Sequence, residues 1–167
     1  MAIHIKIICV GKLKERFYTD AANEYIKRLA GYCKTEVVEI PEHRIPPGSV
    51  SAAYIGLTLE KERIAIERVC TSGQPQTGML TVALCVEGRG MDSIGLSELL
   101  SDCAVSGTSC LCFIIGGSFG LHEDVKNKAD IKLSMSKMTF PHNLARVMLL
   151  EQLYRAFNIN EGGKYHK

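Results

Sequence analysis

Short apolar runs alternate along the chain with longer stretches in which apolar residues recur every three or four positions. Continuous apolar runs predict strands that are buried on both faces of a sheet, and β-branched residues in alternation also favour a strand. The five predicted strands are His4–Val10, Thr35–Ile40, Leu80–Val86, Cys110–Ile115 and Ile131–Ser134.

The stretches between these strands predict helices. From Glu15 to Leu29, apolar residues recur at four-residue intervals, which aligns them on one helical face. Residues 60–63 are all charged and are predicted to lie on a solvent-facing side of their helix. The predicted helices are Glu15–Leu29, Val50–Val69, Ser97–Ala104 with Ser97 as a possible cap, Glu123–Lys128 and Asn143–Phe157.

Strands that alternate with helices predict an α/β fold with a parallel sheet covered on both faces. Right-handed crossovers then bring the loops after Val86, Ile115 and Ser134 to one edge of the sheet. The loop Pro41–Gly48 is the best candidate for a mobile segment, and Thr71–Gly78 is predicted to be a turn. At 167 residues, the chain is expected to form one domain over residues 1–167.

The composition is that of a globular protein, with 46% hydrophobic and 23% charged residues. A net charge of +2 permits an RNA partner through a local basic patch but does not require one. No apolar run approaches the ~18 residues of a membrane helix, so no membrane segment is expected.

The 7 cysteines are odd in number and form no C-x-x-C pair. Several lie within apolar runs, where free cysteine behaves as a small hydrophobic residue. No secretory signal is visible, and a reducing cytoplasm is the predicted compartment. The five histidines lack the spacing of metal ligands, so no metal is expected.

Two loops carry candidate binding chemistry. The glycines of residues 116–120 would let the backbone approach a ligand closely ahead of a helix, although they match neither a dinucleotide fingerprint nor a P-loop. The loop Met135–Phe140 could wrap a purine with its backbone groups while Met138 and Phe140 cover the base. A plain tight turn and a plain connector, with Pro141 opening the next helix, are the alternative interpretations.

The last helix is apolar on more than one face, which suggests burial against both a core and a second subunit. Glu151 and Arg155 are spaced to form an ion pair, whereas Arg146 has no acidic residue four positions away and is the better functional candidate. His166 lies in a terminal segment that would normally be frayed, so pattern alone disfavours a function for it without excluding one.

Four segments together resemble one family. They are Gly-Gly-Ser-Phe-Gly-Leu at 116–121, Leu-Ser-Met-Ser-Lys-Met-Thr-Phe-Pro-His at 133–142, Glu-Gln-Leu-Tyr-Arg-Ala-Phe at 151–157, and the terminal Tyr-His-Lys. The chain is similar in these segments to the ribosomal large-subunit RNA methyltransferase H family, within the SPOUT methyltransferases. One departure follows Leu84, where the family often has an acidic residue and this chain has Cys85.

The resemblance implies a parallel-sheet SPOUT methyltransferase fold with a C-terminal trefoil knot that binds S-adenosylmethionine. It also implies a homodimer that methylates N3 of a pseudouridine in 23S ribosomal RNA on the assembled 70S ribosome. The donor site of the family falls here on Leu84, Gly116, Met135, Ser136, Lys137, Met138, Thr139 and Phe140.

Methyl transfer to N3 requires alignment in a dry pocket and help in removing a weakly acidic proton. The hypothesis is that the tail returns to the donor pocket, where His166 or Tyr165 contacts the base and Arg146 steadies developing charge. The alternatives are a SPOUT enzyme acting on another RNA, such as a transfer RNA ribose, and a non-catalytic, flavodoxin-like nucleotide-binding module. A purely structural dimer would bind no cofactor at all.

Overall fold

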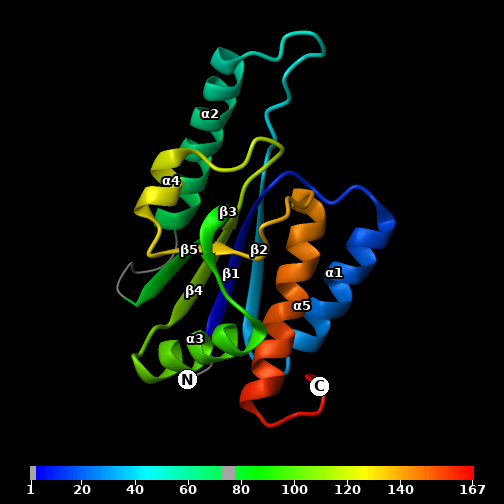
Figure 1. Cartoon of the computed structure of the whole chain (residues 1–167), viewed down its shortest axis with the longest axis vertical. Coiled ribbons are helices and arrows are strands. Elements are labelled where there is room, and N and C mark those ends of the chain that lie inside the picture. The colour runs from blue at the N-terminus through cyan, green and yellow to red at the C-terminus, as the bar shows by residue number, and fades with distance from the viewer. Residues whose placement is uncertain (1–2, 73–77) are drawn as a thin grey trace.

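The computed structural model describes residues 3–72 and 78–167 as five strands and five helices (Figure 1). Most of the turn predicted at 71–78 lies outside the described residues. Within the described part of the chain, no helix is long and apolar enough to cross a membrane. The elements are β1 His4–Val10, α1 Arg16–Leu29, β2 Lys34–Ile40, α2 Ala52–Thr71, β3 Met79–Gly90, α3 Ser93–Val105, β4 Cys110–Ile115, α4 Glu123–Lys128, β5 Ile131–Ser134 and α5 His142–Asn160.

All five strands belong to one sheet with the order β2-β1-β4-β3-β5, and every neighbouring pair is parallel. In the middle of β1, Ile7 pairs with Val37 on one side and with Phe113 on the other. Residues in β1 and β4 are buried throughout, as continuous apolar runs predict. The predicted α/β class with a parallel sheet is confirmed.

Helices cover both faces of the sheet, with α1, α3 and α5 on one face and α2 and α4 on the other (Figure 1). Successive strand residues point to opposite faces, so each strand contributes to two cores. Ile5, Ile7 and Phe113 pack under α1, α3 and α5, whereas Ile8 and Ile114 pack under α2 and α4.

The strand β3 is longer than the predicted Leu80–Val86 and continues through Gly90. The pairing with β5 shifts between Leu84 and Arg89, both of which pair with Leu133. A side chain at Gly88 would lie 2.8 Å from the backbone of Lys132, so glycine is required where the two strands meet. Glycines at 88 and 90 predict a loop when read alone, but the neighbouring strand keeps them extended.

Two helix predictions are wrong in detail. The helix α3 begins at Ser93 and not at Ser97, because the side chain of Asp92 accepts a hydrogen bond from the N–H of Gly95 at 2.7 Å. Ser97 is buried within α3. In α2, Glu62 is buried and not solvent-facing, with 4% of its surface exposed, because the turn after β4 packs against it and its Oε1 is 3.6 Å from the Cβ position of Gly117.

The helix α5 lies between α1 and α3, and this placement accounts for the width of its apolar surface. Its buried residues include Leu149, Leu150 and Leu153. On the side of α1, the rings of Tyr154 and Phe157 lie within 6 Å of Tyr32. Helices of the same chain therefore cover much of this surface, so its width alone does not require a second subunit, and the dimer stays a prediction.

Candidate functional site

A cavity of about 750 Å³ opens at the carboxyl edge of the sheet, where β3, β4 and β5 end. Parallel strands place their carboxyl ends together, so three segments far apart in sequence meet here. The cavity is lined by residues 84–87, 115–121, 126, 133, 135–136, 138–142 and 145. The loops after Ile115 and Ser134 meet here as predicted, whereas the lining segment 84–87 belongs to β3 and not to a loop after Val86.

The turn after β4, residues 116–120, forms one wall of this cavity and is called the glycine turn. It folds back on itself, with a bridge between Gly117 and Gly120 and a φ of 78° at Gly120. A Cβ at Gly116 would overlap the carbonyl group of Gly120 and lie 2.9 Å from the N–H nitrogen of Leu121. The turn therefore requires glycine at position 116 for its own closure, whatever ligand it faces.

The opposite wall is the β5–α5 loop, residues 135–140, which its serines hold in shape. The hydroxyl of Ser134 donates to the carbonyl of Ser136 at 2.9 Å, and Ser136 Oγ accepts from the N–H of Met138 at 3.0 Å. These short contacts replace regular pairing and leave Met138 73% exposed. Lys137 is exposed and does not line the cavity.

The cavity contains a cation that is already neutralised. Lys126 is buried, and its Nζ contacts Oε1 of Glu87 and Oε1 of Glu123, the latter at 2.5 Å. The hydrogen bond from Lys126 lowers the pKa of Glu87. Cys85 also lines the cavity, and burial raises the pKa of its thiol, so it remains neutral. The family often has an acidic residue where this chain has Cys85, and Glu87 is an acidic residue two positions farther along the same strand.

Two carboxyl groups lie behind the glycine turn, on the side away from the cavity. Ser118 Oγ donates to Oε1 of Glu42 at 2.8 Å, and Oε1 of Glu62 is 3.6 Å from the Cβ position of Gly117. Burial raises the pKa of Glu62 to about 7, although the N–H of His43 donates to it. A smaller cavity of about 350 Å³ is lined by residues that include Glu42, His43, Glu62 and Ser118.

The structure brings seven of the eight predicted donor residues to one cavity. They are Leu84, Gly116, Met135, Ser136, Met138, Thr139 and Phe140. Lys137 is the exception, since it is part of the same loop but outside the lining. In the described residues, no group of three or more His, Cys, Asp or Glu side chains could hold a metal ion.

The C-terminal tail, residues 164–167, packs against α5 of its own chain. Tyr165 OH donates to Oε1 of Glu151 at 3.1 Å, and the Tyr165 ring lies 4.9 Å from that of Tyr154. Burial, with the Glu151 contact, raises the pKa of Tyr165 to about 12. His166 is exposed.

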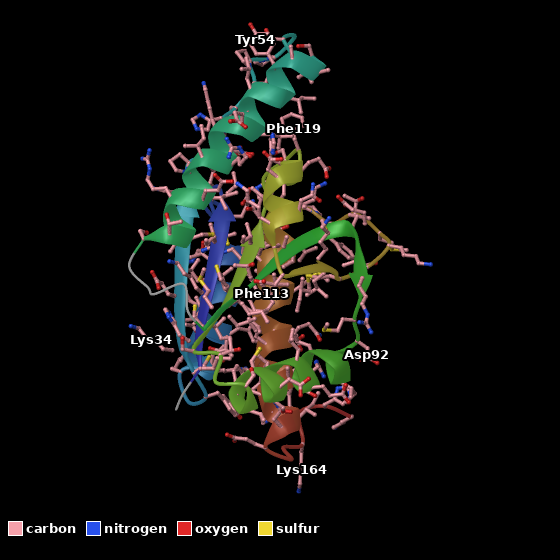
Figure 2. The ribbon with its side chains drawn as sticks, turned by 90° about the vertical axis from the view of Figure 1, so that its left-hand side faces the viewer. Lys34, Tyr54, Asp92, Phe113, Phe119 and Lys164 are labelled. Atoms are coloured by element: carbon pink, nitrogen blue, oxygen red, sulfur yellow. The ribbon has the colours of Figure 1, made fainter. Side chains whose placement is uncertain are left out.

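This position is far from the cavity of the same chain. Tyr154 is twelve residues beyond His142, which lines the cavity, so the two are separated by about 18 Å along the helix. Figure 2 shows Phe119, another lining residue, toward one end of the molecule and Lys164 at the other. The single chain does not bring His166 or Tyr165 to the predicted donor residues.

Arg146 has a partner that its spacing along the helix could not reveal. Its Nη1 donates to Oε1 of Glu39 in β2 at 2.8 Å, and it is buried outside the cavity lining. The predicted pair of Glu151 and Arg155 is confirmed, with Nε to Oε1 at 3.0 Å. Arg146 is therefore an ion-paired core residue in the single chain, since only tertiary contact places Glu39 beside it.

Sequence reasoning missed several lining residues, among them Glu87, Lys126 and His142. Glu87 lies in β3 and Lys126 in α4, so their pairing could not be read from spacing. The place of His142, at the start of α5 and just after the predicted 135–140 loop, was a usable signal. His122 caps α4, where its Nδ1 accepts from the N–H of Asp124 at 3.0 Å.

The model of the family described as "Predicted SPOUT methyltransferase" matches residues 3–166 of the chain, which therefore belongs to the SPOUT methyltransferases. Two relatives narrow the assignment, and both are named ribosomal RNA large subunit methyltransferase H. The protein of Clostridioides difficile (strain 630) is 42% identical over 165 residues, and that of Clostridium novyi (strain NT) is 43% identical over 168. Each match covers 99% of this chain and all of the relative, so the chain is a member of that family.

Solved structures support the fold alone. A probable methylase family protein from Haemophilus influenzae Rd KW20 aligns with a TM-score of 0.57 at 14% identity, covering 100% of this chain and 72% of that one. A probable methyltransferase from Bordetella pertussis Tohama I gives the same TM-score at 13% identity, covering 93% and 96%.

Proposed function

We propose that the chain uses S-adenosylmethionine to methylate N3 of a pseudouridine in large-subunit (23S) ribosomal RNA on the assembled 70S ribosome. The observation that carries this proposal is the cavity between the glycine turn and the β5–α5 loop, in a chain that matches the methyltransferase H relatives from end to end. The cytoplasm is the corresponding compartment.

The chemistry of the cavity suits the donor. Its volume of about 750 Å³ is in the range of small-molecule sites, and Leu84, Ile115, Leu133 and Phe140 give it apolar walls. The loop backbones offer polar groups for a purine and an amino acid. A cationic sulfonium would be repelled by a free ammonium, but Lys126 is already paired with Glu87 and Glu123.

Bound S-adenosylmethionine supplies a methyl group on a cationic sulfur, and the bonding electrons remain on sulfur as the methyl passes to N3. The residues of the chain have to hold the base in line and accept the N3 proton. Tyr165 is a poor acceptor because its hydroxyl already donates to Glu151 and its pKa is raised to about 12. His166 is exposed and is the leading candidate.

We assign the tail to the pocket of a partner copy in a homodimer. About 18 Å of helix separates Tyr154, which holds Tyr165, from the start of α5 in the same chain. A tail that acts in trans removes this difficulty, and each site then needs two subunits. This assignment replaces the earlier argument from the apolar width of α5.

The proposal extends to one domain over residues 1–167 and to a trefoil knot. Support for the knot comes from membership of the SPOUT methyltransferases. The connection from β4 to β5 crosses β3, which lies between these two strands in the sheet. Such a crossing also occurs in unknotted parallel sheets, so the strand order alone does not carry the knot.

The test is methyl transfer to ribosomes from a strain that lacks the modification, followed by mass spectrometry of the nucleosides. N3-methylated pseudouridine in the large-subunit RNA is the expected product. Isolated RNA, small subunits and transfer RNA serve as controls. Methylation of transfer RNA in place of ribosomes would support the alternative SPOUT function, and binding of FMN without S-adenosylmethionine would support the flavodoxin-like alternative.

A further inference from the structure

Residues 12–17, called the basic segment, leave the sheet beside the cavity. They follow Gly11, which has a φ of 88° and whose N–H donates to the carbonyl of Ile40 at 2.7 Å. A Cβ at Gly11 would lie 3.6 Å from Nε2 of His142, which lines the cavity. Six residues extend at most ~20 Å, so the basic segment stays near this edge. Figure 1 shows the connection from β1 to α1 beside the start of α5.

The basic segment contains three cationic side chains and only one carboxylate. Lys12, Lys14, Glu15 and Arg16 are all exposed. Across residues 3–72 and 78–167, neither lysine forms an ion pair, and Arg16 has only an exposed contact of 3.5 Å from Nε to Oδ2 of Asp20. The basic segment thus carries as large a net charge as the whole chain, whose total is +2.

Charge of the opposite sign gathers around α3. Asp92 caps this helix, and Glu98 and Asp102 lie within it, while α3 contains no basic residue. Figure 2 shows Asp92 well away from Phe119, which marks the cavity end of the molecule. The unpaired lysines of the basic segment therefore lie at the rim of the cavity, whereas this acidic group on α3 lies away from it.

The basic segment also ends on an exposed aromatic ring. Phe17 is 65% exposed, although it continues the apolar face of α1 that is formed by Ala21, Tyr25 and Leu29. Contact with α5 covers that face farther along but not at its first turn. The ring centroids of Phe17 and Tyr18 are 4.3 Å apart at an interplanar angle of 52°. A flat apolar face is therefore open to solvent beside free ammonium groups.

We propose that the basic segment is a docking surface for unpaired nucleotides that flank the methylated base, with phosphates on Lys12 and Lys14 and a base stacked on Phe17. The inference rests on the proposed function and names the surface that brings that RNA to the cavity. Lysines bind phosphates and release counterions, and aromatic rings stack on unpaired bases in a sequence-tolerant way. Charge complementarity therefore favours RNA as the occupant.

The charge test uses the double variant Lys12→Ala/Lys14→Ala. We expect about a tenfold or greater rise in KM for unmodified ribosomes at moderate salt, with kcat and the Kd for S-adenosylmethionine unchanged. The slope of log affinity against log salt should decrease by about 1.4 to 1.8, the release expected from two phosphate contacts. Lys12→Arg/Lys14→Arg should retain wild-type KM.

The matched control is Lys27→Ala/Lys34→Ala, which removes two exposed lysines away from the cavity. Figure 2 shows Lys34 well away from Phe119. This control should change neither KM nor the salt slope. Equal effects of the two double variants would mean that only total charge matters, and this would overturn the docking surface.

The stacking test compares Phe17→Leu with the wild-type protein, because leucine keeps apolar area but removes the flat ring. We expect KM for ribosomes to rise about tenfold without a change in the salt slope. Wild-type kinetics in this variant and in Lys12→Ala/Lys14→Ala would overturn the inference while leaving the proposed function intact. If sedimentation showed instead that these variants alter dimerisation, the surface would be a subunit interface. A wild-type protein that methylates no ribosomes would overturn the proposed function, and the docking surface with it.

Discussion

At its first turn α5 borders the cavity, whereas along its second half it carries the C-terminal tail. At the N-terminal end of α5, backbone groups form the walls of the cavity. The glycine turn closes on itself, and the β5–α5 loop is held by Ser134 and Ser136. At the other end, the contacts are between side chains, with Tyr165 against Tyr154 and Arg155.

This difference separates two requirements of methyl transfer. A parallel sheet gathers its loops at one edge, so a donor pocket can be complete within one chain. A group that acts on the RNA base is needed only when RNA is bound, so it can lie on a segment that reaches another pocket. The comparison predicts that substitutions around the cavity, at the N-terminal end of α5, change donor binding and that substitutions in the tail change turnover.

The largest expected effect is that of Gly116→Val. A Cβ at this position overlaps the carbonyl of Gly120, so the turn has to open, and binding of S-adenosylmethionine should become undetectable by calorimetry. Gly56→Ala is the control, since nothing lies within 4 Å of its Cβ position in α2. A folded Gly116→Val protein with wild-type donor affinity would contradict the assignment of the cavity.

Removal of residues 165–167 should lower single-turnover methylation of unmodified ribosomes by roughly 10²-fold or more, the scale of one acid–base or positioning group. Donor affinity should stay the same because the group on the tail is needed only once RNA is bound. His166→Ala should reproduce much of the loss and Lys167→Ala little of it. Full activity of His166→Ala would make the histidine a bystander.

Mixed dimers distinguish action in cis from action in trans. When Gly116→Val protein is refolded together with the tail-less variant, half of the dimers contain one chain of each kind. If the tail serves the partner, one pocket in each mixed dimer is intact, and activity should recover to about a quarter of the wild-type value. Recovery would not occur if each tail served its own pocket.

The residue Glu62 behind the glycine turn should make stability depend on pH. Its pKa is raised to about 7 from 4.5, so the folded state binds more protons and loses stability as pH rises between these values. Glu62→Gln should stabilise the protein at pH 8 by up to about 3 kcal/mol and leave it unchanged near pH 4. Urea unfolding at both pH values measures this, and a constant difference would refute it.

The smallest expected effect is that of Arg146→Met, which leaves Glu39 without its partner. Because Glu39 is partly exposed, we expect a loss of about 2 kcal/mol in the free energy of unfolding, less than for a fully buried pair. The methylation rate per folded enzyme should stay close to that of the wild type. A large fall in this rate without a change in donor affinity would mean that Arg146 takes part in catalysis.

Much of the fold and of the candidate site could be predicted from the sequence, because the local pattern and the fold class agree. The five strands follow from apolar runs, and the meeting of the loops after β4 and β5 follows from a parallel sheet with right-handed crossovers. The prediction failed where a distant residue decides the outcome. Gly88 stays in a strand because β5 passes against it, and Glu62 is buried because the glycine turn packs against it.

The sequence by itself determined the order of elements, the parallel sheet and the loops that line the cavity, since these depend on periodicity and on motifs contiguous along the chain. Only the tertiary structure decided which charged groups are paired. Two pairs show this: Arg146 is 107 positions from its partner Glu39, and Lys126 is 39 positions from its partner Glu87. It also decided that the tail lies along α5, because Tyr165 packs on Tyr154, which also packs against Tyr32 from outside α5.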